Sequence, residues 1–302
     1  MSRYGGIEFG GTKTVCVVGQ RGRIDEEVRF PTGNRPLETV RACLQFLTGQ
    51  GHLAGVGIGS FGPCDPDPAS PGYGCITTTP KPGWSGFDVL RTLRSGLPDT
   101  HMAFDTDVNA AALGEWVHGA GRGVESLVYI TVGTGIGAGI VARSGLIHGL
   151  QHPEAGHMLI PRPEAERRRF TGVCPYHRDC WEGLASGPAM HARWGRPPQE
   201  IPEDGEDYAK MWDLEADYVA AGLHNIVCTV SPQRIILGGG VGQQAALLSR
   251  VKPRLQVSLA GYVTHSALSE SIDAYIVAPG LGARAGGIGA IELAARAHEH
   301  AA

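Results

Sequence analysis

The sequence predicts an α/β protein built from two related halves. Segments typical of strands alternate with segments typical of helices along the 302 residues, which is the pattern of α/β architecture. A strand, a glycine turn and a second strand open the chain at residues 5–18, and a similar arrangement returns at residues 127–142. Such an internal repeat indicates two halves of related design. The 45 glycines are bunched in the turns, which indicates places where backbone approaches another group closely.

The individual elements follow from local apolar patterns. Residues 5–18 are expected to form a hairpin around Gly10 and Gly11. Apolar spacing of the helical period predicts helices over 37–47, 87–97, 108–117, 213–230 and 283–297. Short apolar runs predict strands over 53–60, 102–105, 127–132, 138–142 and 234–237. The six prolines of residues 62–84 predict an irregular segment.

These elements are expected to form two α/β lobes. The N-terminal lobe is predicted over residues 1–117 and the C-terminal lobe over 118–289. The last helix, within residues 290–302, is expected to pack back on the N-terminal lobe.

Composition excludes several classes of function. The net charge of −4 and the pI of about 6.3 provide no basic field for nucleic acid or an anionic membrane. The start shows no apolar signal-peptide core and no stretch is long enough to span a bilayer, so a cytoplasmic protein is expected. The seven scattered cysteines argue against a disulfide framework.

Three glycine turns are candidate phosphate sites. Backbone N–H groups in such turns can point at an anion, and a threonine hydroxyl adds a hydrogen bond. The residues concerned are Gly10, Gly11, Thr12 and Lys13; Gly133, Thr134 and Gly135; and Gly238, Gly239, Gly240, Val241 and Gly242. The second turn is neither a P-loop nor a dinucleotide fingerprint, because no Gly-Lys-Ser/Thr follows and the next segment resembles a strand. A plain hairpin is the alternative for the first turn, and each turn alone is a weak signal, whereas three in this order, two of them on hairpins, indicate ATP.

Two aspartates are candidates for the general base. Transfer of a phosphoryl group to a hydroxyl needs a carboxylate that accepts the proton. Asp105 and Asp107 stand where a predicted strand passes into a predicted helix. Alternation would place both on one side if the strand continued, so spacing alone does not choose between them. Asp107 has a structural alternative as the N-cap of the helix.

A cluster of cysteine and histidine predicts a zinc site. Cys174, His177 and Cys180 supply three ligands within seven residues, and His157 completes a closed tetrahedral set. The alternative is a pair of reduced cysteines with a surface histidine. His148 and His152 are interpreted as bystanders, with His152 as the first rival for the fourth ligand position.

Taken together, these motifs resemble the ROK family of bacterial sugar kinases and repressors. The resemblance rests on the first Gly-Gly-Thr turn, Thr106-Asp107-Val108-Asn109-Ala110, the Gly-Thr-Gly-Ile-Gly turn, Glu154-Ala155-Gly156-His157 and the triple glycine. It extends from residue 5 to about residue 297. The segments Tyr73–Trp84 and Cys174–Pro188 are similar to the fructokinase branch in particular.

The resemblance implies a two-lobed actin-like ATPase (ribonuclease H-like) fold with the active site in the cleft between lobes. It implies a kinase that phosphorylates a hexose with ATP and Mg²⁺, fructose to fructose 6-phosphate being the first choice. Glucose, mannose or an N-acetylhexosamine is the alternative substrate, and a sugar-sensing regulator is the alternative from another class. It also implies a homodimer with a structural Zn²⁺ and no nucleic-acid or membrane partner.

The resemblance also assigns roles to residues. Asp107 matches the catalytic base, and Pro188 joins Gly238–Gly242 in lining the nucleoside, while the first two turns hold phosphates. Glu8 is a candidate to hold Mg²⁺ through water. Two departures from the family stand out: Thr106 replaces a frequent asparagine, and His177 takes the place of a cysteine ligand. The residues expected to bind sugar are Gly62, Pro63, Asn109, Glu154, His157 and Glu182.

Overall fold

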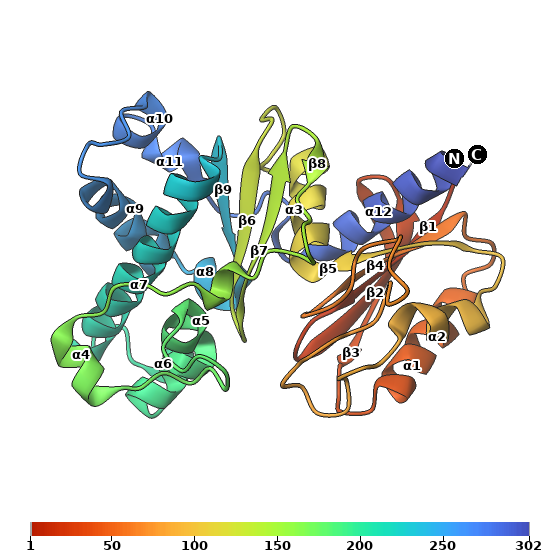
Figure 1. Cartoon of the computed structure of the whole chain (residues 1–302), viewed down its shortest axis with the longest axis horizontal. Coiled ribbons are helices and arrows are strands. Elements are labelled where there is room, and N and C mark those ends of the chain that lie inside the picture. The colour runs from red at the N-terminus through yellow and green to blue at the C-terminus, as the bar shows by residue number, and fades with distance from the viewer. Residues whose placement is uncertain (1, 302) are drawn as a thin grey trace. The chain divides into compact units, whose positions relative to one another are not determined.

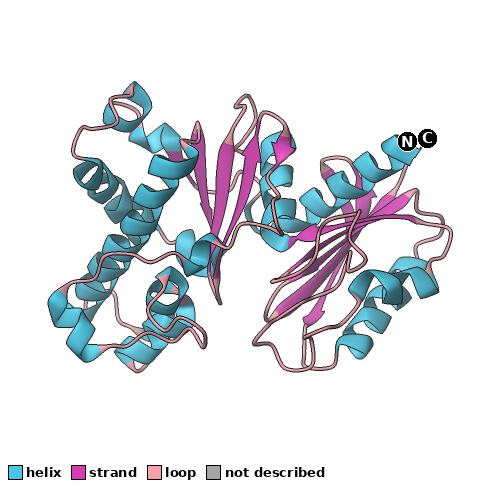
Figure 2. Ribbon diagram, in the orientation of Figure 1, coloured by secondary structure: helices cyan, strands magenta, loops and turns pink. Residues whose placement is uncertain are grey.

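The computed structural model describes residues 2–301, which contain two five-stranded sheets with helices around them (Figures 1 and 2). The strands are β1 (Tyr4–Phe9), β2 (Lys13–Gln20), β3 (Arg23–Pro31), β4 (Gly55–Ser60), β5 (His101–Thr106), β6 (Leu127–Val132), β7 (Ile136–Ala142), β8 (Gly145–Leu146), β9 (Arg234–Gly238) and β10 (Ile276–Val277). The α-helices are α1 (Pro36–Thr48), α2 (Val89–Gly96), α3 (Asp107–His118), α4 (Glu164–Arg169), α5 (Trp181–Ala185), α6 (Gly187–Trp194), α7 (Glu206–Val230), α8 (Gly239–Gly242), α9 (Ala245–Leu259), α10 (Ser266–Ser269), α11 (Ile272–Tyr275) and α12 (Ala285–Ala301). Short 3₁₀ turns are η1 (Ala155–His157), η2 (Pro198–Glu200) and η3 (Gly282–Arg284).

The chain packs as two compact units. Unit 1 comprises residues up to 125, residues 139–153 and residues from 280 onwards, and unit 2 comprises residues 126–138 and 154–279. These units differ from the lobes expected from the sequence, because residues 118–125, 139–153 and 280–289 pack with the N-terminal part of the chain. Strand β7 crosses the boundary between the units, so its two ends belong to different cores.

In unit 1, the sheet brings three strand ends to one edge. Its order is β3-β2-β1-β4-β5, with β4 and β5 parallel to β1. Phe9, Ser60 and Thr106 are the last residues of β1, β4 and β5, and they lie side by side in register. The turns that follow these strands therefore start at the same edge, where ligands of α/β sheets commonly bind.

Helices cover both faces of this sheet. Helices α1 and α2 lie together over a core that includes Phe9 and Ile58 (Figure 1). The other face packs against α12, where Ile291 meets Val17 in a smaller core. A Cβ on Gly289 of α12 would come within 1.6 Å of the Ala110 carbonyl oxygen of α3. The close crossing of α3 and α12 therefore requires glycine at this position.

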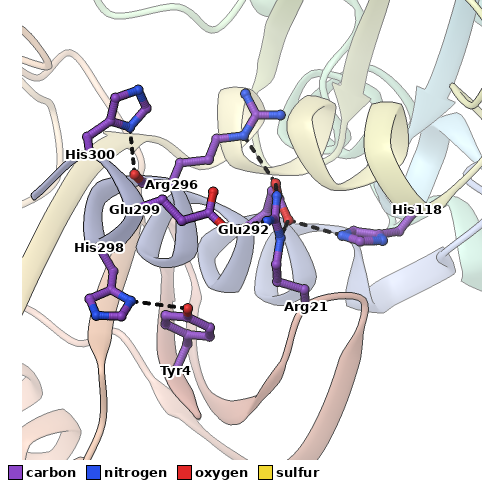
Figure 3. Close-up of polar contacts among 8 residues, drawn as sticks. All are labelled: Tyr4, Arg21, His118, Glu292, Arg296, His298, Glu299 and His300. Atoms are coloured by element: carbon purple, nitrogen blue, oxygen red, sulfur yellow. Dashed lines mark hydrogen bonds and ion pairs between the residues drawn. The ribbon is translucent and has the colours of Figure 1, made fainter. Parts of the chain in front are cut away.

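Helix α12 is fastened by a buried carboxylate. The Glu292 side chain, which is fully buried, receives hydrogen bonds from Arg21 at 2.5 and 3.0 Å and from Arg296 at 3.1 Å (Figure 3). Nε2 of His118, at the end of α3, lies 3.2 Å from the same carboxylate. Burial raises the pKa of Glu292, but these three partners outweigh it and hold the pKa below its usual value. The carboxylate thus joins the last helix to the β2–β3 turn and to α3.

In unit 2, the sheet order is β10-β9-β6-β7-β8, including the part of β7 and β8 that packs with unit 1. Strands β6 and β9 are parallel, with Thr131 opposite Gly238, so the turns after them are neighbours. Helix α7 packs against α9 (Figure 1), and Trp181 of α5 is fully buried against Gly222 of α7.

Most predicted elements are present, but several short strands and helices were not predicted, namely β8, β10, α4, α5, α6, α10 and α11. Strand β3 was not predicted, because its largely exposed, charged side chains give no buried strand pattern. Helix α9 was also missed, and it contains Pro253 inside its second half. Helix α7 begins at Glu206, seven residues before the expected start. Among the described residues, no helix combines the length and apolar character needed to cross a bilayer.

Candidate active site

Asp107 is the first residue of α3, at the sheet edge of unit 1. The helix is capped by Thr106, whose hydroxyl accepts a hydrogen bond from the Asn109 N–H at 3.1 Å. Asp107 is therefore not the N-cap, and its carboxylate accepts a bond from the Val108 N–H at 2.9 Å. Burial raises the pKa of Asp107 to about 6, against the lowering effect of the Val108 and Asp107 N–H groups. Such a carboxyl changes its ionisation close to neutral pH.

Glu8 is a second partly exposed carboxyl in the same part of unit 1. Burial and the negative charge of Asp107 raise the pKa of Glu8 to about 7, while Lys13 and Arg29 lower it. Its side chain lies against α12, where a Cβ on Gly286 would fall 2.3 Å from Oε2. Two carboxyls that resist joint ionisation are suited to share a cation, because a positive charge would favour the ionised form of both.

The turn Gly10–Lys13 is stabilised through its carbonyl groups. The Gly10 N–H donates to the Lys13 carbonyl at 3.0 Å, and the Thr32 hydroxyl donates to the Gly10 carbonyl at 2.7 Å. Lys81 reaches the Gly11 carbonyl with its ammonium group at 2.7 Å. Sequence reasoning missed Thr32 and Lys81, which lie far along the chain and carry no local motif.

Gly62 and Pro63 follow β4 and are joined by a cis peptide bond. The Pro63 carbonyl accepts bonds from the Thr77 N–H at 2.8 Å and the Thr77 hydroxyl at 3.1 Å. The next residue, Cys64, donates its N–H to Nε2 of His152 at 3.2 Å. His152 is therefore committed within unit 1 and does not join the cysteine–histidine cluster.

Trp84 is a core residue. It is fully buried, its Nε1–H donates to the Gly33 carbonyl at 3.0 Å, and its ring packs edge-on against Phe9, Phe61 and Phe87. The structure therefore gives Trp84 a packing role in the core of unit 1.

Asp105 is engaged by three donors. Its Oδ1 accepts bonds from the Thr106 N–H and from Nδ2 of Asn109, both at 2.7 Å, and its Oδ2 lies 2.9 Å from Nε2 of His148. His148 lies outside the cysteine–histidine cluster, as interpreted from the sequence, but it contacts the Asp105 carboxylate 43 positions away in the chain, a partner that the sequence did not indicate. Asn109 is 1% exposed and its Oδ1 is enclosed by protein.

In unit 2, the second and third glycine turns lie together. Gly133 closes its turn by donating to the Gly135 carbonyl at 2.9 Å, and a Cβ on Gly133 would lie 3.7 Å from the Gly240 nitrogen. Gly239 has φ of +83°, and a Cβ there would meet the Val132 carbonyl oxygen at 2.3 Å. The predicted nucleotide residues of this unit therefore form one glycine-lined surface at the ends of β6 and β9.

Glu182 and Pro188 adjoin this surface. Oε2 of Glu182 accepts a bond from the Ile136 N–H at 2.9 Å, and a Cβ on Gly135 would lie 2.6 Å from that oxygen. Gly187, which precedes Pro188 in α6, donates to the Gly133 carbonyl at 2.7 Å. Glu154 is exposed at the start of η1. The structure thus brings Glu182 and Pro188 to the predicted phosphate turn.

The four predicted zinc ligands are gathered in unit 2. The ligand atoms of His157, Cys174, His177 and Cys180 all lie within 4.8 Å of one another. The two Nδ1 atoms are 3.3 Å apart, and Nδ1 of His157 is 3.4 Å from the Cys180 sulfur and 3.8 Å from the Cys174 sulfur. Tetrahedral zinc bonds of ordinary length separate two nitrogen ligands by about 3.3 Å and a nitrogen from a sulfur by about 3.6 Å. The donor set and its spacing therefore fit a zinc ion.

The loop of this cluster has a fixed backbone. Arg178 adopts φ of 60° and exchanges two backbone hydrogen bonds with Cys174, at 3.0 and 3.3 Å. A Cβ on Gly172 or Gly183 would lie 1.9 Å from the Arg178 carbonyl oxygen, so both glycines permit close approach. Burial raises the pKa of the Cys180 thiol to about 12. A bound cation would reverse this effect and hold the sulfur as a thiolate.

With this fold and these two groups of residues established, the chain can be placed in a family. The model of the ROK family matches residues 4–297, and the chain belongs to this family. Its fold is the predicted actin-like ATPase fold. The ROK glucokinase of Streptomyces griseus, solved with glucose and AMPPNP, superposes with a TM-score of 0.78 at 25% identity, covering 97% of this chain and 99% of that chain.

Two relatives are closer in sequence. A fructokinase of Pediococcus pentosaceus is 39% identical over 298 residues, covering 98% of this chain and 99% of the relative. A fructokinase of Zymomonas mobilis is 40% identical over 299 residues, covering 96% of each. The similarity therefore extends over the whole of both units and is not confined to one motif.

Proposed function

We propose that this protein is an ATP-dependent kinase that transfers the γ-phosphoryl group to fructose and forms fructose 6-phosphate. Its full-length relatives at 39 and 40% identity are fructokinases. A neighbour of the same fold was solved with a sugar and an ATP analogue. The substrate class follows from these relatives, and the chemistry follows from the residues of the two units.

The observation that carries the chemistry is the Asp107 carboxyl. It lies partly exposed at the edge where three parallel strands end, and its pKa of about 6 makes it ionised yet basic at neutral pH. A base of this kind accepts the proton of the sugar hydroxyl as its oxygen attacks phosphorus. The phosphorus–oxygen bond to ADP breaks as the new bond forms, and Asp107 then releases the proton.

Glycine turns would hold the nucleotide. Gly10–Lys13 in unit 1 and Gly133–Gly135 in unit 2 offer backbone N–H groups to phosphates. Gly238–Gly242 and Pro188 would line the nucleoside. Mg²⁺ would accompany ATP, and Glu8 is the residue of unit 1 placed to hold it through water.

In unit 2, the residues that would bind the sugar are Glu154, His157 and Glu182. In unit 1, the residues predicted to bind it are Gly62 and Pro63. A carboxylate accepts a hydrogen bond from a hydroxyl, while an imidazole can donate or accept one. The two kinds of group together can therefore orient one sugar. His157 turns Nδ1 toward the cluster, which leaves Nε2 for a hydroxyl. Zinc would fix the loop on which His157 and Glu182 stand, and would take no part in the reaction.

A panel of sugars tests this assignment. ADP release is coupled to a spectrophotometric assay with fructose, glucose, mannose and N-acetylglucosamine, each with and without ATP and Mg²⁺. The highest kcat/KM is expected for fructose. Glucose or another sugar exceeding fructose would overturn the substrate assignment, and no ADP with any sugar would favour a sugar-sensing protein without catalysis.

A further inference from the structure

A buried polar network surrounds the peptide that carries Asp107. Asp105 ends β5 on one side of this residue, and Asn109 lies in the first turn of α3 on the other. Their side chains are joined by the hydrogen bond of 2.7 Å between Asp105 Oδ1 and Asn109 Nδ2. Nε2 of His148 lies 2.9 Å from the second oxygen of Asp105 and 3.3 Å from Nδ2 of Asn109. The bond between Asp105 and Asn109 closes a ring that contains the backbone of Thr106, Asp107 and Val108, and His148 contacts both of the side chains that close it.

This ring has little room to relax. Asp105 is 4% exposed and Asn109 is 1% exposed. Beneath them, a Cβ on Gly59 of β4 would lie 2.9 Å from the Ala110 Cβ and 3.2 Å from the Asp107 Cα. The backbone of Asp107 is thus held between β4 and the network. Buried hydrogen bonds of this kind fix one geometry, since each broken bond leaves a polar group unsatisfied.

The outer member of the network can change its charge. The His148 side chain is 37% exposed and contacts Asp105 of β5 and Asn109 of α3. It interacts electrostatically with Asp67 of the proline-rich segment and with His152 of its own segment. The hydrogen bond to Asp105 raises the pKa of His148, against burial, and the charges of Asp105 and Asp67 raise it further. A protonated imidazole gives a charge-assisted bond that is stronger than the bond from a neutral ring.

We propose that Asp105, Asn109 and His148 are positioning residues that hold the first turn of α3 and thereby aim the Asp107 carboxylate, with the hold strengthened by the proton on His148. The inference rests on the proposed role of Asp107 as base. It assigns Asn109 a place behind the base in preference to a direct contact with sugar, because its Nδ2 is bound to Asp105 and its Oδ1 is enclosed.

Substitution of His148 separates this role from a purely structural one. His148→Gln keeps a neutral donor toward Asp105, whereas His148→Leu keeps none. We measure kcat and KM for fructose between pH 6 and 9.5, together with Tm. For the wild type, kcat should decrease about three- to fivefold on the alkaline side as His148 loses its proton. His148→Gln should show about that reduced kcat at all pH values, without the alkaline decrease.

His148→Leu should lose more, on the order of 10- to 100-fold in kcat, because a small misplacement of a catalytic group is costly. KM for ATP and fructose should change less than about twofold in both variants. An NMR titration of His148 should give a pKa above the ordinary histidine value, and Asp105→Asn should lower it. An unchanged His148 titration in Asp105→Asn would overturn the proposed pairing.

His118→Gln is the matched control. His118 also pairs with a buried carboxylate, but at the far end of α3. It should change Tm and keep the alkaline decrease in kcat. The inference fails if His118→Gln abolishes that decrease, if the His148 variants keep wild-type kcat, or if their losses appear only in KM. Asp107→Asn is measured alongside. If this variant is active, the proposed role of Asp107 as base is wrong. If it is inactive while the His148 variants behave like the wild type, only the proposed positioning network is wrong.

Discussion

Replacing Asp107 by asparagine should lower turnover and raise stability together. Asparagine has the same shape and keeps an oxygen to accept the bond from the Val108 N–H, but it cannot take a proton from the sugar hydroxyl. Loss of a general base typically costs 10²- to 10⁴-fold in rate. KM for ATP and fructose should change only a few-fold, because the substitution leaves the glycine turns intact.

The gain in stability follows from the pKa of Asp107. Burial raises it from 3.8 to about 6, so the folded protein holds the ionised carboxylate less favourably than the unfolded chain does. This cost is fully present above about pH 6 and disappears as the pH falls below 3.8. A shift of roughly two units corresponds to at most about 3 kcal/mol at neutral pH. For a chain of this length that is a rise in Tm of up to about 5 °C.

The assay compares both proteins by thermal unfolding at pH 8 and pH 5, and by kcat in the coupled assay. The variant should be more stable at pH 8, and the difference should shrink at pH 5. Wild-type kcat should rise with pH as Asp107 ionises near pH 6. Near-normal kcat in the variant would remove Asp107 as base, and a variant less stable than the wild type at pH 8 would refute the burial argument.

Three further changes have expected outcomes. Cys174→Ser, like chelation, should release zinc and lower Tm and kcat together, as judged by metal analysis and calorimetry, whereas Cys228→Ser at an exposed position should do neither. Gly239→Ala should lower the free energy of unfolding by about 1–3 kcal/mol because of the positive φ at this position, and it should raise KM for ATP. Urea unfolding measures the loss of stability, and Gly240→Ala is the control because a Cβ at that position meets nothing within 4 Å. Glu292→Gln should lower the free energy of unfolding by about 1–3 kcal/mol at pH 7. Because the pKa of Glu292 is lowered in the folded protein, this loss of stability should shrink as the pH falls toward 4. A loss that grows toward pH 4 would contradict the assignment.

The part of the fold that the sequence predicted is the part with local patterns. Apolar residues on both sides of two glycines predict β1 and β2, and a segment rich in alanine predicts α3. Strand β3 was missed because its side chains are mostly exposed and charged, and it is held by pairing with β2. Its stability thus comes from a neighbouring strand, which a local pattern does not report.

The residues of the candidate site that the sequence predicted are likewise those with a local pattern. The cysteine–histidine cluster was found because three of its four residues lie within seven positions, at a spacing that metal loops require. Thr32, Lys81 and His148 were missed because each acts on a residue between 22 and 70 positions away. Each of these contacts depends on how the sheet and its loops bring distant residues together. A single threonine, lysine or histidine in a loop gives no local signal of such a partner.

The choice between Asp105 and Asp107 shows what three-dimensional structure adds to spacing. On a continuing strand the two carboxylates would point the same way, but β5 ends at Thr106 and Asp107 begins a helix. Asp105 therefore turns inward, where three donors occupy its oxygens. The Asp107 carboxylate accepts a hydrogen bond from the Val108 N–H. A base must have an oxygen available to a substrate proton, so the hydrogen bonds that occupy the oxygens of Asp105 favour Asp107 as the proposed base.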